Sequence, residues 1–202
     1  MSKFKPPFTL ALVYIFIIAL YSIAAPTNEV PGETLARMKK LGEEYATPNE
    51  NHAFLNRLSG NWNTSSTVME LPQEEGKAIF EMILGDRFLN GDISGTFAKV
   101  PYAGRVTIGY DNFKHKFVAT FLDDLGTSIR SAEGSLDKTG NILSLWGSID
   151  EWMTDQHDNP VKYRYIIVDK DQFVFEIYDL AAHPNSVVIK TTYRRVGQVD
   201  ED

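Results

Sequence analysis

Ten short runs of strand-forming residues follow one another after residue 61, separated only by a few turn-forming residues each. Such short connections require antiparallel pairing, because a parallel pair needs a crossover of about a dozen residues or more. Ten strands in series, without a crossover helix, are predicted to close into an all-β, up-and-down barrel, which removes exposed edges. A sandwich is the competing arrangement, and it would normally need a long connection. The runs are 62–71, 76–84, 87–99, 104–111, 117–123, 128–136, 142–150, 161–168, 172–180 and 187–196.

One or two short helices are predicted to precede the barrel. Residues 33–45 carry apolar side chains at helical spacing, and Pro48 interrupts this segment. Residues 49–58 form a second amphipathic segment with Asn49 or Asn51 as the candidate N-cap. Gly60 follows that segment and suits a helix end.

The first 24 residues have the pattern of a secretory signal peptide. Lys3 and Lys5 precede an apolar stretch at residues 8–23, and Ser22-Ile23-Ala24 is a small-x-small cleavage pattern. The alternative is an uncleaved anchor, which would be the chain's only membrane contact. We therefore expect a signal peptide at 1–24, a linker and short helix at 25–48 and the barrel domain at 49–198, in a secreted or periplasmic protein.

Composition excludes several classes of function. The 202 residues include no cysteine, which rules out disulfides, thiolate metal sites and cysteine nucleophiles. A net charge of −7 argues against a nucleic-acid binder, since phosphate neutralisation needs clustered Lys and Arg. The four histidines lack metal-ligand spacing, and no Gly-x-Ser-x-Gly motif is present. We expect no metal, no cofactor and no catalytic residue that the sequence alone identifies.

Side-chain alternation in the last strands predicts two unlike faces. Phe173, Phe175 and Ile177 share one face of their run, whereas Glu176 and its neighbours at 174 and 178 share the other. The same contrast of an aromatic and a mixed face recurs in 161–168 and 187–196. A mixed face fits either an outer surface or a lumen with some polar lining. Because about ten strands enclose more space than side chains fill, a cavity is expected.

A short helix followed by Gly60-Asn61-Trp62 opens the barrel. This Gly-x-Trp entry is similar to that of lipocalins and the wider calycin superfamily. A longer series of stretches resembles, in order, the bacterial family called domain of unknown function 1579. The resemblance implies a lipocalin-like barrel and supplies no reaction, since the family has no established activity. The stretches are 58–62 (LSGNW), 82–89 (MILGDRFL), 108–111 (IGYD), 123–127 (DDLGT), 132–134 (AEG), 160–164 (PVKYR), 175–178 (FEIY) and 192–194 (TYR).

The resemblance to calycins also implies a structural role for Trp62. This side chain is expected to plug one end of the barrel, with a basic side chain from the last strand stacked across it. Arg194 is the first candidate for that partner and Arg195 the second. A contact of this kind contributes roughly 0.5–2 kcal/mol.

Four charged residues inside the predicted strands are candidates for ligand binding: Glu81, Arg87, Arg164 and Glu176. They either face solvent in cross-strand pairs or point into the lumen and orient the polar group of a ligand. Arg164 is the strongest candidate, because a guanidinium suits carboxylates. The adjacent Asp123 and Asp124 are predicted to form a turn, and the acidic stretch 150–160 a solvated loop.

These observations favour a barrel that binds a small, apolar or amphipathic ligand. One alternative is an enzyme that uses lumen carboxylates such as Glu81 or Glu176 as acid or base. A second alternative is a closed, packed barrel that serves as an interaction module. The binding hypothesis requires an open cavity, and we expect at least one of the four charges to reach into it.

Overall fold

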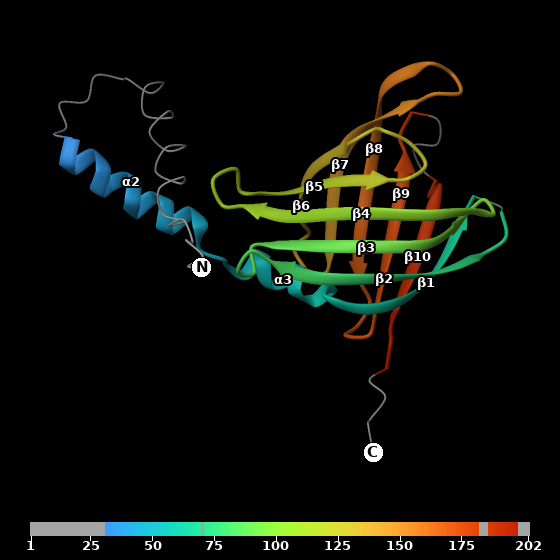
Figure 1. The fold of residues 1–202 in the computed structure, drawn as a ribbon, viewed down its shortest axis with the longest axis horizontal. Coiled ribbons are helices and arrows are strands. Elements are labelled where there is room, and N and C mark those ends of the chain that lie inside the picture. Colours follow the sequence, from blue (N-terminus) through green and yellow to red (C-terminus); the bar gives the residue numbers. More distant parts are fainter. Residues whose placement is uncertain (1–30, 70, 182–185, 198–202) are drawn as a thin grey trace, which may run out of the picture. The chain divides into compact units, whose positions relative to one another are not determined.

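The structure is a computed structural model that describes residues 31–69, 71–181 and 186–197 (Figure 1). The expected signal peptide at 1–24 lies outside the described residues. The chain divides into two compact units, Met1–Glu43 and Glu44–Asp202. The described part of the first unit belongs to helix α2 (Pro31–Ala46), which has no buried residue. No helix among the described residues has the length and apolar character needed to cross a membrane.

Helix α3 (Glu50–Leu58) covers one end of the barrel. Its N-cap is Asn49, whose side-chain oxygen accepts the backbone N–H of Asn51 at 3.0 Å. His52 completes the capping box, because its Nδ1 accepts the backbone N–H of Asn49 at 3.0 Å. The capped helix directs its apolar face, which includes Phe54, Leu55 and Leu58, into the core.

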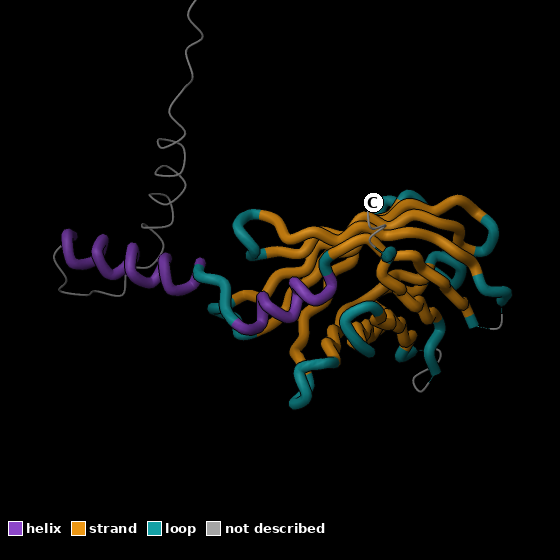
Figure 2. The backbone as a smooth tube through the Cα atoms, turned by 90° about the horizontal axis from the view of Figure 1, so that it is seen from below, coloured by secondary structure: helices purple, strands orange, loops and turns teal. Residues whose placement is uncertain are grey.

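Ten antiparallel strands form a closed barrel, as the turn spacing predicted (Figures 1 and 2). Each strand pairs with its neighbours in sequence, and β1 pairs with β10 to complete the ring. In Figure 1, β2 to β5 run across the view and β7 to β10 run up it. The strands are β1 (Gly60–Val68), β2 (Glu74–Ile83), β3 (Phe88–Phe97), β4 (Val100–Asp111), β5 (Lys116–Asp123), β6 (Arg130–Leu136), β7 (Ile142–Glu151), β8 (Gln156–Ile167), β9 (Gln172–Asp179) and β10 (Ile189–Arg195).

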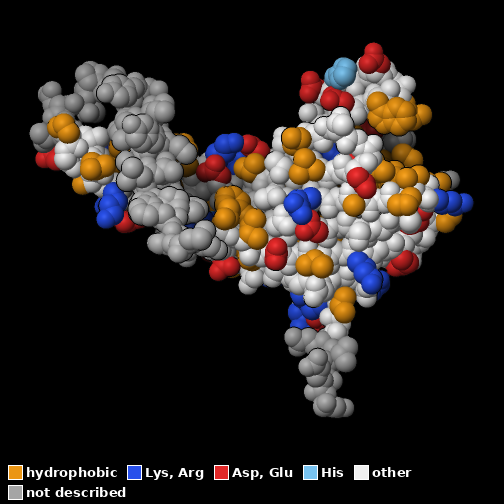
Figure 3. All heavy atoms as spheres, viewed as in Figure 1, with side chains coloured by type: hydrophobic (Ala, Val, Ile, Leu, Met, Phe, Trp, Pro, Cys, Tyr) orange, Lys and Arg blue, Asp and Glu red, His pale blue; other side chains and the backbone are white. Residues whose placement is uncertain are grey.

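The solvated loop expected at 150–160 is a hairpin instead. Strands β7 and β8 continue past the predicted ends and pair up to Glu151 and Gln156, with a bulge in the register. Asp155 and Asp158 adopt φ values of 55° and 57°, which aspartate tolerates better than most residues and which let the chain reverse here. Trp152 and Met153 at the tip are 87% and 76% exposed. Figure 3 shows hydrophobic, acidic and histidine side chains gathered over this hairpin, at the top of the view.

Trp62 occupies the end of the barrel that α3 covers. It is 2% exposed, its Nε1–H donates to the backbone oxygen of Leu58 at 3.0 Å, and its ring meets the edge of Phe173 at 4.8 Å. The predicted plug is therefore present in the structure. α3 and Trp62 together close this end, which we call the closed end.

The stacked cation is Arg195, so the first choice of Arg194 was wrong. The Arg195 guanidinium lies 4.1 Å from the centre of the Trp62 ring and donates to the backbone oxygen of Ser59 at 2.8 Å. The register explains the choice, because Arg195 is directly opposite Trp62 on β10 while the exposed Arg194 is opposite Asn63. Gly60 makes room with a φ of 132°, since a Cβ there would lie 2.2 Å from Nη1 of Arg195.

Replacing the plug should destabilise the barrel strongly. We expect Trp62→Ala to lower the free energy of unfolding by about 3–5 kcal/mol, because the void it leaves at the closed end cannot collapse fully. Trp146→Ala is the matched control, since Trp146 is 50% exposed on the outer wall and should change stability by about 0.5 kcal/mol or less. Urea unfolding followed by circular dichroism measures both, and equal losses would show that Trp62 is not the plug.

Candidate functional site

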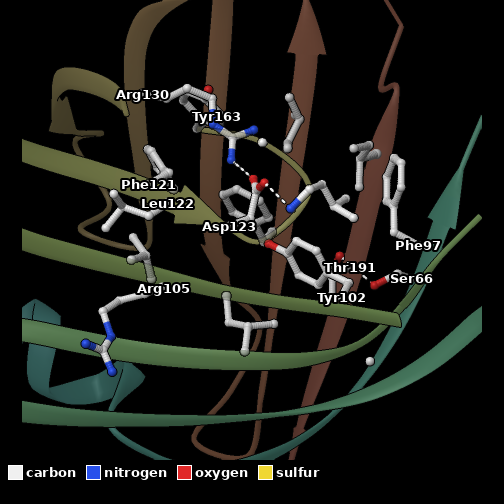
Figure 4. A pocket seen from close by; sticks show the side chains of 18 of the residues that line it. Ser66, Phe97, Tyr102, Arg105, Phe121, Leu122, Asp123, Arg130, Tyr163 and Thr191 are labelled. Carbon is white, nitrogen blue, oxygen red and sulfur yellow. Dashed lines mark hydrogen bonds and ion pairs between the residues drawn. The ribbon is translucent and has the colours of Figure 1, made fainter. Parts of the chain in front are cut away.

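A cavity of about 570 Å3 lies inside the barrel at the end opposite Trp62 (Figure 4). We call this end the mouth, because the lining residues come from the strand ends that lie farthest from α3. They include Val68 at the end of β1, Phe97 at the end of β3 and Ile189 at the start of β10. The strands whose ends are joined at the mouth are β1 and β2, β3 and β4, β5 and β6, β7 and β8, and β9 and β10.

The lumen walls are largely aromatic. Phe121 on β5 stacks on Tyr163 on β8 with ring centres 4.6 Å apart and planes 26° apart. Tyr163 is also nearly parallel to Phe175 on β9, at 6.1 Å and 10°. Deeper in the barrel, Phe173 stacks on Tyr193 at 4.1 Å. The aromatic face that alternation predicted for the last strands is therefore the inner face.

One ion pair lies in the lumen wall near the mouth. Asp123 at the end of β5 pairs through Oδ2 with Nη2 of Arg130 at the start of β6 (Figure 4). Its other oxygen accepts the backbone N–H of Leu125 at 3.1 Å. The Asp123 side chain is 13% exposed and that of Arg130 is 32% exposed. Within the described residues, the buried Nε of Arg130 has no hydrogen-bond partner.

The turn predicted for Asp123 and Asp124 is present. Asp124 points away from Asp123, as expected for neighbours at a strand end, and its Oδ1 accepts the backbone N–H of Ala103 at 2.9 Å. Asp123 shapes the turn through Leu125 and lines the lumen as well. The turn hypothesis was thus correct for both residues and incomplete for Asp123.

The four charged residues singled out from the sequence do not line the cavity formed by the described residues. Arg164 and Glu176 are brought together on the outer wall, with Nη1 of Arg164 3.3 Å from Oε2 of Glu176. The Tyr178 hydroxyl joins them, at 3.1 Å from Nη1 of Arg164 and 2.9 Å from Oε2 of Glu176. They face outward because Tyr163, Tyr165 and Phe175 occupy the inward positions of the same strands.

The remaining two charges lie apart from this outer cluster. Glu81 is exposed on the outer face of β2. Arg87 belongs to the turn between β2 and β3, where its Nε donates to the backbone oxygen of Ala46 at 2.7 Å and its Nη1 to that of Leu84 at 2.9 Å. The expectation that one of the four reaches the lumen was wrong. The enzyme hypothesis loses its named carboxylates, Glu81 and Glu176, for the same reason.

Arg130 is one of the charged lining residues that sequence reasoning did not place in the lumen; Glu74, Glu75 and Arg105 are others. Alternation along residues 128–136 places Arg130 on the same face as Ala132 and Gly134, and Ala132 is buried in the core. That pattern was available in the sequence. It is weak because the residues that share this face with Arg130, namely Ala132 and Gly134, have small side chains, whereas the aromatic face of Tyr163 and Tyr165 is distinctive.

Burial dominates the titration of the lumen tyrosines. It raises the pKa of Tyr165 well above 10 and raises that of Tyr193 as well, and neighbouring tyrosines add to both shifts. Burial also raises the pKa of Tyr102, and the Asp123 carboxylate adds to that shift. These hydroxyls therefore stay protonated in the folded barrel. The described residues hold no group of three or more His, Asp or Glu side chains arranged to bind a metal ion.

The raised tyrosine pKa values predict a loss of stability in alkali. Above pH 10 the unfolded chain releases protons that the folded barrel keeps, so the free energy of unfolding falls as pH rises. Each of Tyr165 and Tyr193 should contribute about 1.4 kcal/mol of this loss at pH 11. Urea unfolding at pH 8 and pH 11 measures it, and Tyr165→Phe with Tyr193→Phe should remove that share. An unchanged pH dependence in the double variant would contradict the assignment.

Comparison with known proteins gives one family. The model of a family described as "Protein of unknown function (DUF1579)" matches residues 47–195. No curated protein matches the chain.

Several solved structures are similar to the barrel. Rv2717c from M. tuberculosis is 15% identical, with a TM-score of 0.49 over 75% of this chain and 100% of that one. A de novo designed fluorescence-activating β-barrel is 9% identical, with a TM-score of 0.41 over 70% and 96%. The redesigned β-barrel mFAP0, bound to DFHBI, is 13% identical, with a TM-score of 0.40 over 69% and 99%.

Proposed function

This chain belongs to the DUF1579 family, and we propose that it is a secreted or periplasmic barrel whose lumen binds a small, partly apolar ligand. The observation that carries the proposal is the cavity of about 570 Å3 behind an accessible mouth. Small-molecule sites are typically cavities of roughly 300–1,000 Å3, lined by apolar side chains and a few polar groups. The lumen has a volume in this range, and its lining combines aromatic and aliphatic side chains with hydroxyl and charged groups, among them Asp123 and Arg130.

The cavity favours binding over a packed interaction module. A small barrel without a ligand site fills its interior with side chains, as roughly eight strands allow. Here ten strands leave space between the Phe121, Tyr163 and Phe175 walls and the opposite side of the barrel. Keeping such walls apart forgoes apolar contacts, which a bound apolar group would restore.

The ion pair near the mouth accounts for the polar part of the ligand. Asp123 and Arg130 neutralise each other, so the empty lumen avoids an isolated buried charge. Both oxygens of Asp123 already have partners, whereas the guanidinium of Arg130, which lines the cavity, has further N–H groups besides the Nη2–H that pairs with Asp123. The pair therefore offers hydrogen-bond donors toward a ligand that has an apolar body and a polar group.

We also propose the lipocalin-like, calycin relationship. Two features support it: an up-and-down ring that begins at Gly60-Asn61-Trp62, and a basic side chain from the last strand stacked on Trp62. In this chain the stacked residue is Arg195.

The secreted or periplasmic location rests on residues 1–24, where Lys3 and Lys5 precede an apolar stretch and a small-x-small pattern. We expect the exported protein to begin at Ala25. N-terminal sequencing of the protein recovered outside the cytoplasm tests this. A chain that begins at Met1 and sediments with membranes would contradict cleavage and indicate an anchor.

Filling the lumen should abolish binding, whereas an equal change on the outer wall should not. Ile177 on β9 lines the cavity, and Ile166 on β8 faces outward between the inward-facing Tyr165 and Ile167. We expect Ile177→Trp to weaken binding of 1-anilinonaphthalene-8-sulfonate at least tenfold, because the indole takes the space of the probe, while Ile166→Trp leaves it within twofold. Titration of probe fluorescence measures the affinity.

Circular dichroism and the melting temperature establish that each variant is folded before the titration. Binding that survives in a folded Ile177→Trp variant, or that both substitutions weaken equally, would place the probe outside the lumen. Either result would remove the main support for a lumen ligand.

A further inference from the structure

Four tyrosines converge on the lumen from three strands. Tyr102 lies on β4, Tyr163 and Tyr165 on β8, and Tyr193 on β10, and all four line the cavity. Ring contacts place two of them near one another, because Phe173 stacks on Tyr193 at 4.1 Å and its centre lies 6.4 Å from that of Tyr165. Figure 4 shows the Tyr102 ring reaching across the mouth toward the side where Asp123 lies.

The hydroxyls of these tyrosines have no hydrogen-bond partner among residues 31–69, 71–181 and 186–197. Tyr163, Tyr165 and Tyr193 are only 3%, 2% and 3% exposed, so bulk solvent reaches little of them. Among the other lumen hydroxyls, Ser66 pairs with Thr191 at 2.9 Å. Arg130 Nε is the buried side-chain atom without a partner among the described residues, so the tyrosine hydroxyls keep accessible surface in the lumen and are open to a hydrogen bond from a guest.

The walls beside these hydroxyls are flat. The rings of Tyr163 and Phe175 lie nearly parallel on neighbouring strands, and Phe121 stacks on Tyr163 with its ring centre 6.4 Å from that of Phe175, so the three rings form one cluster. Parallel aromatic walls favour a planar aromatic guest, since offset stacking adds to the burial of apolar area. An aliphatic chain would gain the burial alone and would leave the hydroxyls unpartnered.

We propose that the ligand is a flat aromatic molecule with oxygen atoms on its ring system, held by the hydroxyls of Tyr102, Tyr163, Tyr165 and Tyr193. This inference rests on the proposed function and specifies its ligand class. Carbonyl, ether or phenol oxygens would pair with the inner hydroxyls, and the ring faces would lie against Phe121, Tyr163 and Phe175. Arg130 and Asp123 would then contact the end of the ligand nearest the mouth.

The test compares two probes of one shape. 7-Hydroxyflavone and 2-phenylnaphthalene share a fused two-ring system with a phenyl substituent, and only the first carries oxygen atoms. We expect the wild-type barrel to bind 7-hydroxyflavone at least tenfold more tightly than 2-phenylnaphthalene, measured by probe fluorescence, because each hydrogen bond to a buried hydroxyl contributes severalfold in affinity. Dodecanoate serves as the aliphatic comparator and should bind more weakly than 7-hydroxyflavone.

Two variants test how much the tyrosine hydroxyl groups contribute to this preference. Tyr165→Phe combined with Tyr193→Phe keeps both rings and removes two hydroxyl groups, so it should lower the preference for 7-hydroxyflavone over 2-phenylnaphthalene about tenfold. Tyr178→Phe is the matched control, because its hydroxyl bonds to Glu176 on the outer wall, and it should leave the preference unchanged.

The outcomes separate this inference from the proposed function. If the lumen binds the probes but the preference survives in the double variant, or dodecanoate binds most tightly, the tyrosine inference is overturned and the lumen site stands. If the folded wild-type protein binds none of the three probes, the proposed lumen site is rejected together with the inference.

Discussion

The pairing of β1 with β10 is the contact on which the rest of the barrel depends. The register runs from Trp62 opposite Arg195 to Val68 opposite Ile189, so the first and last strands meet over most of their length. The number of strands in the closed ring sets the diameter of the barrel. The diameter in turn sets how much space the inward side chains must fill. The same pairing brings Arg195 over Trp62, so closure of the ring and closure of one end come from one interface.

The barrel wall separates two ion pairs with different surroundings. Arg164 and Glu176 pair on the outside, where Tyr178 covers them and Glu176 is 8% exposed. Asp123 and Arg130 pair on the inside, next to the aromatic walls. Burial alone therefore does not identify a lumen charge in this fold. Whether a charged side chain lies in the lumen depends on the face of the sheet that it occupies. A shift of the strand register by one residue would move that side chain to the other face.

Turn spacing was sufficient to predict the closed ring, and helical spacing the helices before it, whereas the plug at Trp62 was predicted from the resemblance to calycins. These patterns did not identify which face of the last strands lies inside, because the mixed face of Arg164 and Glu176 could belong to either side. The aromatic face was the better guide, since ten strands need bulky inward side chains to limit the void. Alternation from Tyr193 puts Arg195, and not Arg194, on the aromatic face, and the register with β1 then sets Arg195 directly opposite Trp62. The 150–160 hairpin was missed because polar residues and Pro160 hide a strand that extends beyond the barrel body.

The chain enters the barrel at Gly60 and leaves it at Arg195, and both points lie beside Trp62 at the closed end. The pairing of β1 with β10 continues to the mouth, where Val68 is opposite Ile189 and the backbone N–H of Met69 donates to the backbone oxygen of Val188 at 2.9 Å. Surface connections tolerate changes of length and sequence far better than the strands they join. The closed end thus carries the Trp62–Arg195 contact, whereas the turns at the mouth can change in length or sequence, so divergence or engineering could remodel the entrance to the cavity while that contact stays constant.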